Sequence, residues 1–230
     1  MDTKEKLCDK HLLQIDNKLK TNTWAKDNPN SAQEILEFLN VSAQLFGLIP
    51  GYIQVLKSIS QDLNKNDSIK WLNYFSQIRC AYYLQSQGIA ITAFEKKTNE
   101  KVIDLELGNK SLCEVKSFEA QIKRNNNAIQ WEELVFDNFV KNKLMPAFDE
   151  QGADLIIIDD IFSDDSKNYR FLNYFLSFIN DPDTDRYAMI HEKLGRYLPK
   201  ILIVSFTQSM TLNPVKRLTG KEWKQLFSSK

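Results

Sequence analysis

A short hairpin pattern at 101–117, KVIDLELGNKSLCEVKS, constrains the fold of this chain more than any other stretch. Apolar residues on both sides of a Gly-Asn pair at 108–109 predict two strands, because Gly and Asn tolerate the backbone angles of a tight turn. If the hairpin turns near 108–110, Asp104 lies opposite the segment from Glu114 to Lys116. Side chains two residues apart in a strand point to the same face, so Glu114 and Lys116 share one. The pattern predicts two carboxylates and an ammonium group at one place.

Such a cluster has the chemistry of a divalent cation site. Two neighbouring carboxylates raise each other's pKa unless a cation lies between them. Mg²⁺ or Mn²⁺ takes hard oxygen ligands, so Asp104, Glu114 and the carbonyl of Val115 are the candidate metal ligands. Lys116 is the candidate for orienting or deprotonating the attacking water. These groups indicate hydrolysis of a phosphodiester; the alternative is a solvated hairpin with an ordinary surface ion pair.

An aspartate followed, after nine residues, by Glu-x-Lys resembles the motif of the PD-(D/E)XK, or restriction-endonuclease-like, nuclease superfamily. At residue level the resemblance covers Asp104, Glu114 and Lys116, and as an ordered series of elements it covers 69–207. It implies an α/β protein with a mixed sheet of the α+β type and an αβββαβ core. It also implies a Mg²⁺- or Mn²⁺-dependent nuclease whose partner is nucleic acid, with DNA favoured over RNA. Ile103 stands where a proline often precedes the aspartate of the family.

The resemblance also points to polar residues outside the hairpin. The family often has a metal-facing glutamate on the helix before the hairpin, but 69–91 contains no acid and Gln77 is the nearest counterpart. On the helix after the hairpin, Gln130 is the candidate to lean toward the site. Lys123 and Arg124 follow the motif and are candidates for phosphate contacts, with a solvated loop as the alternative. The missing carboxylate keeps a second hypothesis open: a weak or inactive protein of this fold that binds nucleic acid or assembles with proteins.

Composition narrows the remaining choices. The 230 residues contain thirty acidic and thirty basic side chains, so any affinity for nucleic acid depends on a local basic surface. Cys8, Cys80 and Cys113 show no Cys-x-x-Cys spacing, and His11 and His191 show no metal-ligand spacing. A zinc site and a Cys/His protease are therefore not expected. We expect a cytoplasmic protein whose cysteines are reduced thiols. The N-terminal segment lacks the apolar core of a signal sequence, and no apolar run reaches the length of a membrane span. No membrane partner is therefore expected. No Gly-rich phosphate loop or Gly-x-Ser-x-Gly elbow occurs either.

The chain divides into an N-terminal extension, residues 1–67, packed on a core formed by residues 68–230 with a C-terminal helix. In the extension, apolar spacing predicts helices within 7–19, 31–49 and 52–63, and an Asn-Pro pair indicates a break at 21–30. A cap on the core and a homodimer or partner surface are the alternatives for these helices.

The predicted core begins with a long apolar helix. Its expected elements are a helix at 69–86, strands at 89–94, 102–107 and 112–115, helices at 128–148, 169–179 and 185–197, buried strands at 153–159 and 200–206, and a terminal helix at 219–227. A turn is expected at 97–100. Glu95 is an alternative acid placed at the rim, and Asp159 is expected to open an acidic loop after its strand.

Overall fold

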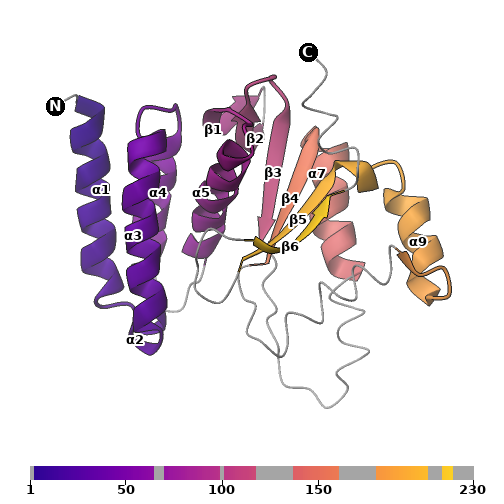
Figure 1. Ribbon diagram of the computed structural model, residues 1–230, viewed down its shortest axis with the longest axis horizontal. Helices are drawn as coiled ribbons and strands as arrows, with labels where there is room; N and C mark the ends of the chain where they lie inside the picture. Colours follow the sequence, from indigo (N-terminus) through magenta and orange to yellow (C-terminus); the bar gives the residue numbers. More distant parts are fainter. Residues whose placement is uncertain are drawn as a thin grey trace.

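The computed structural model describes residues 3–64, 70–98, 101–117, 137–160, 180–206 and 214–219. They form a mixed α/β protein in which helices pack on both faces of a sheet, so the predicted class is confirmed. Figure 1 shows the N-terminal helices on one side and the sheet beside them. No helix within the described ranges is long and apolar enough to cross a membrane.

Four helices make up the N-terminal part: α1 (Thr3–Leu19), α2 (Thr23–Asp27), α3 (Pro29–Phe46) and α4 (Tyr52–Asp62). The prediction of a helix break at 21–30 is wrong for residues 23–27, which form α2. The side chain of Asn22 caps that helix by accepting a hydrogen bond from the amide of Ala25 at 3.2 Å, and Pro29 begins the next helix. Asn and Pro are common at the start of a helix as well as in loops. The Asn-Pro pair that predicted a break is therefore also compatible with two closely spaced helices.

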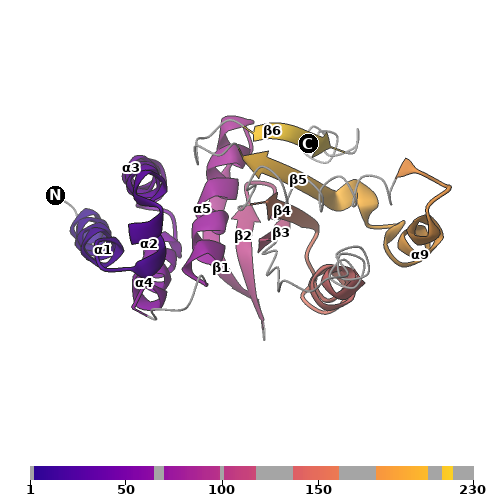
Figure 2. The same ribbon diagram turned by 90° about the horizontal axis from the view of Figure 1, so that it is seen from below.

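The helix α5 (Trp71–Ser86) lies between the N-terminal helices and the sheet, as Figure 2 shows from below. One hydrophobic cluster extends from α1 through α5 to the strands, so α5 is buried around most of its circumference. Three of its buried side chains are nevertheless polar: Ser76, Gln77 and Arg79. Buried polar groups need partners, and the sheet supplies them.

The six-stranded sheet has the order β1-β2-β3-β4-β5-β6. Its strands are β1 (Ile91–Thr98), β2 (Lys101–Leu107), β3 (Leu112–Ser117), β4 (Leu155–Asp160), β5 (Ile201–Phe206) and β6 (Pro214–Thr219). The first three strands are antiparallel, whereas β4 is parallel to both β3 and β5. The strands predicted at 89–94, 102–107, 112–115, 153–159 and 200–206 are therefore all present, while β6, antiparallel to β5, was not expected.

Two boundaries differ from the sequence prediction. Lys97 and Thr98 belong to β1 and pair with Val102 and Lys101, so the first half of the predicted turn is strand. Asp159 lies inside β4 and is buried, not in an acidic loop. Charged residues usually indicate the end of a strand. Backbone pairing with a neighbouring strand, or an ion pair with a buried side chain such as Arg79, can keep them inside the strand.

The second hydrophobic cluster covers the opposite face of the sheet. Residues 137–139 are helical and continue into a π-helical turn η1 (Val140–Leu144) and α7 (Met145–Asp149), while α9 (Asp185–Leu194) and the short η2 (Leu198–Lys200) precede β5. Their apolar side chains pack against alternate residues of β4 and β5. The predicted helix at 169–179 and the first part of that at 128–148 lie outside the described residues. Of the predicted terminal helix at 219–227, Thr219 ends β6 and the rest lies outside the described residues.

Candidate metal centre

Strand register places three acids at one level of the sheet. Phe94 lies opposite Leu105 and Lys96 lies opposite Ile103, which puts Glu95 opposite Asp104.

On the other side of β2, Leu105 lies opposite Cys113. Continuing that antiparallel register by one residue puts Asp104 opposite Glu114. Asp104 is therefore the central acid of a row that runs across β1, β2 and β3. The register between β2 and β3 follows from a three-residue loop at 108–110, closed by the amide of Leu107 donating to the carbonyl of Ser111 at 3.0 Å. Lys110, not Gly108 or Asn109, has the left-handed φ of 67° in this loop.

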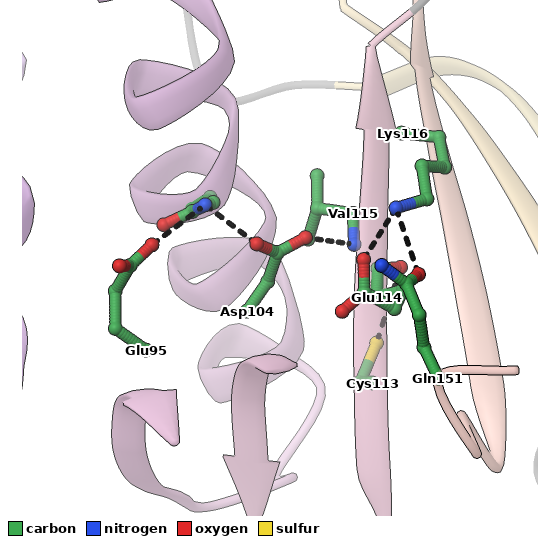
Figure 3. Close-up of polar contacts among 8 residues, drawn as sticks. Glu95, Asp104, Cys113, Glu114, Val115, Lys116 and Gln151 are labelled. Carbon is green, nitrogen blue, oxygen red and sulfur yellow. Dashed lines mark hydrogen bonds and ion pairs between the residues drawn. The ribbon is translucent and has the colours of Figure 1, made fainter. Parts of the chain in front are cut away.

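The carboxylate of Asp104 takes hydrogen bonds from two elements. Its Oδ2 accepts from the backbone amide of Val115 at 2.8 Å, and its Oδ1 accepts from Nε2 of Gln77 at 2.6 Å. Figure 3 shows Asp104 between α5 and β3. In an extended strand the N–H and C=O of one residue point toward the same neighbouring strand. The carbonyl of Val115 therefore faces the Asp104 side of β3, where a ligand to a shared cation must lie.

Beyond Asp104, β3 presents an ion pair. The Nζ of Lys116 donates to Oε2 of Glu114, which agrees with the predicted sharing of one strand face, and it also reaches Oε1 of Gln151 at 3.4 Å (Figure 3). Glu114 is only 2% exposed. A nearly buried carboxylate next to a second carboxylate needs a positive neighbour, and Lys116 supplies one to one of its oxygens.

Two buried oxygen atoms at this place have no hydrogen-bond partner among the described residues: Oε1 of Glu114 and Oε1 of Gln77. Most buried polar atoms are paired, so unpaired oxygens beside an acidic cluster suit an added cation. No three His, Cys, Asp or Glu side chains within the described part of the chain gather closely enough to hold a metal ion by themselves. Two carboxylates with one backbone carbonyl form a sparse donor set, which fits an ion such as Mg²⁺ that keeps several water ligands.

The electrostatics agree with this arrangement. Burial raises the pKa of Asp104 well above its usual value, the charge of Glu114 raises that pKa further, and the charge of Lys116 opposes the rise. Burial also raises the pKa of the Cys80 and Cys113 thiols, so neither is a thiolate nucleophile at neutral pH. The site is thus a place where negative charge is unfavourable unless a cation is supplied.

A second buried acid lies outside this cluster. Asp159 on β4 is fully buried, and its carboxylate accepts hydrogen bonds from Nε of Arg79 at 3.1 Å, from a terminal nitrogen of Arg79 and from the hydroxyl of Ser76. Both of these partners are on α5. Because Arg79 balances the charge, Asp159 has the features of a structural ion pair.

The structure thus brings Asp104, Glu114, Val115, Lys116 and Gln77 together. The other three candidates, Gln130, Lys123 and Arg124, lie outside the described residues.

Two neighbours were missed or misplaced by the sequence reading. Glu95, expected at the rim, has its Oε1 3.3 Å from Nε2 of Gln77. The register of the first two strands was a usable signal for it. Gln151, which contacts Lys116, had no sequence signal because it lies in the loop before β4 and reaches the site only through the parallel pairing of β3 with β4.

Comparison with known proteins adds no assignment. No protein-family model matches the chain, and no curated protein and no solved structure matches it.

Proposed function

We propose that this protein is a divalent-cation-dependent nuclease of the PD-(D/E)XK type, which hydrolyses phosphodiester bonds, with DNA as the favoured substrate. The observation that carries the proposal is the placement of Asp104 against the peptide bond that joins Glu114 to Val115, with Lys116 on the same strand. The order α5, β1, β2, β3, α7, β4, with β3 parallel to β4, supports the αβββαβ core of that fold.

Each residue has a distinct role in the proposal. Asp104, Glu114 and the carbonyl of Val115 hold Mg²⁺ or Mn²⁺. When bound, the cation neutralises charge on the phosphate oxygens and helps to position the reacting groups. Lys116 orients the attacking water and stabilises the negative charge on the phosphate oxygens in the transition state. Gln151 restrains the Lys116 ammonium group through its side-chain oxygen.

The test is a cleavage assay on supercoiled plasmid, linear duplex DNA, single-stranded DNA and RNA, with Mg²⁺, Mn²⁺ or EDTA. Asp104→Asn and Lys116→Met are compared with Glu106→Gln and Lys57→Met. The first control removes an acid from the same strand whose carboxylate is paired with Lys96, and the second removes an exposed lysine of α4.

We expect cation-dependent cutting that both site variants lose, by about 10²–10⁴-fold for Lys116→Met. Both control variants should retain it. Cutting that survives in EDTA, or in both site variants, would refute the proposal.

A second candidate function has one observation in its favour. Both oxygens of Asp104 already accept hydrogen bonds from the protein itself, and Gln77 supplies an amide where many nucleases of this type have an acid. A binding or assembly module with little or no catalysis fits that arrangement. Cation binding without cleavage of any of the four substrates would favour this second function.

A further inference from the structure

The side-chain amide of Gln77 bridges two acids. Its Nε2 lies 2.6 Å from Oδ1 of Asp104 and 3.3 Å from Oε1 of Glu95. A primary amide carries two N–H donors, and each meets one carboxylate here. Turning the amide round would direct its oxygen at both acceptor-only groups. The two acids therefore fix the orientation of Gln77, which is only 6% exposed.

Glu95 is held in place by its backbone. It has a left-handed φ of 48°, a region that residues other than glycine seldom occupy. The amide of the preceding residue, Phe94, donates to the carbonyl of Pro50 at 2.8 Å, and a Cβ on Gly51 would come within 1.9 Å of the Phe94 carbonyl oxygen. Strained backbone of this kind persists only where the surroundings enforce it, and such positions concentrate at functional sites. The loop before α4 thus directs Glu95 toward Gln77.

Two neighbouring carboxylates bridged at one point form the usual setting for a cation. Here the bridging atom between Glu95 and Asp104 is the amide nitrogen of Gln77. The two flanks of Asp104 each keep one buried side-chain oxygen without a partner among the described residues, Oε1 of Gln77 and Oε1 of Glu114, but these oxygens differ in charge. On the Gln77 side the oxygen belongs to a neutral amide whose nitrogen already contacts both acids, whereas on the other side it belongs to a carboxylate, which is the better ligand for a divalent cation.

We propose that the Gln77 amide occupies the position that a second cation would take between Glu95 and Asp104, so that the site binds one divalent cation, on the Asp104–Glu114 side. This inference rests on the proposed metal centre and deepens it. Glu95 then hydrogen-bonds to Gln77 on the Gln77 side of Asp104 and is not a ligand of the bound ion.

The test counts Mn²⁺ ions bound per chain by electron paramagnetic resonance of the free ion during a titration, with calorimetry for the affinity. The wild-type protein should bind one ion. Gln77→Glu replaces the amide by a carboxylate next to Glu95 and Asp104 and should bind two. Gln85→Glu makes the same change near the end of the same helix, where the side chain contacts only the amide of Ile91 among the described partners, and should bind one.

Two further variants keep the inference testable if Gln77→Glu does not fold. Glu95→Gln should bind one ion with unchanged affinity, since Glu95 does not touch the ion, whereas Glu114→Gln should lose binding. Two ions in the wild type, one ion in folded Gln77→Glu, or lost affinity in Glu95→Gln would each overturn the inference while leaving a metal centre in place. No ion bound to the wild type would overturn the proposed metal centre itself.

Discussion

Asp159 and Asp104 are acids of the same sheet that are both contacted by α5, and the protein treats them in opposite ways. Asp159 receives the charged group of Arg79 together with the hydroxyl of Ser76. Among the described residues, Asp104 receives hydrogen bonds from neutral donors alone, the amide of Gln77 and the backbone amide of Val115.

The surroundings of the two acids reinforce the contrast. The pKa of both acids is raised by burial. The charge of Arg79 opposes that rise at Asp159, whereas at Asp104 the charges of Glu114 and Glu95 add to the rise and the charge of Lys116 opposes it. An acid balanced by a cation of its own chain stabilises one packing arrangement. An acid short of positive charge, in a cluster of perturbed groups, is where an external cation and chemistry are expected. The comparison separates a structural carboxylate from the one that we propose to be functional.

The largest effect on stability should come from breaking the structural pair. Arg79→Met leaves Asp159 buried without its cation, and loss of one partner of a buried pair lowers the free energy of unfolding by about 3–5 kcal/mol. Urea denaturation followed by circular dichroism measures it. The double variant Arg79→Met with Asp159→Leu removes both charges and should recover most of the loss. A loss below about 1 kcal/mol in the single variant would show that Asp159 is balanced by other groups.

A smaller, opposite effect is expected from adding a cation. Mn²⁺ at a hundred times its dissociation constant should raise the free energy of unfolding by about 2.7 kcal/mol, because it binds the folded state only. Thermal denaturation with Mn²⁺ or EDTA measures the gain. Glu114→Gln should abolish it, while Glu106→Gln, whose carboxylate is already paired with Lys96, should keep it. Equal stabilisation of the two variants would place the ion elsewhere.

The pH dependence of stability should distinguish two acids of one strand. Because the pKa of Asp104 is raised in the folded protein, the folded state holds its proton more tightly than the unfolded state. Its contribution to stability therefore falls as the pH rises from the ordinary value of 3.8 through the raised one. In EDTA, Asp104→Asn should lose less stability than the wild type over this rise.

Glu106 provides the matched comparison, with the opposite sign. Its hydrogen bond from Lys96 lowers its pKa, so its contribution is present above the unfolded pKa and is lost as the pH falls. Glu106→Gln should therefore lose stability relative to the wild type at neutral pH and approach it in acid. Parallel curves for the wild type and Asp104→Asn would contradict the raised pKa of Asp104.

The smallest effect is expected at an exposed pair. Asp16 of α1 and Lys20, which directly follows that helix, form an ion pair at 2.8 Å. The side chain of Lys20 is 66% exposed. Lys20→Ala should lower the free energy of unfolding by about 0.3–0.5 kcal/mol, since water screens such pairs. Urea denaturation at low and high salt measures it. If Lys20→Ala lowered the free energy of unfolding as much as Arg79→Met does, burial would not explain the difference between the exposed Asp16 pair and the buried Asp159 pair.

Much of the local structure around the candidate site could be predicted from the sequence. The alternation of apolar residues around a Gly-Asn turn predicted the hairpin, and its register placed Asp104 against the segment from Glu114 to Lys116. The continuous apolar run at 153–159 predicted a buried strand, which the structure pairs in parallel with β3 and β5. These predictions succeed because strand alternation and turn preferences are properties of a few consecutive residues.

The partners of the buried acids were decided by the tertiary structure alone. Gln77 reaches Asp104 across 27 positions of sequence, and Arg79 reaches Asp159 across 80. Which face of α5 meets which strand depends on how the helix packs between the N-terminal helices and the sheet, and almost its whole circumference is buried. A helix that is buried all round has no single apolar stripe to orient it. The sequence by itself therefore determined that two carboxylates and a lysine meet on one hairpin, whereas packing decided that an amide, and not a charge, completes the cluster.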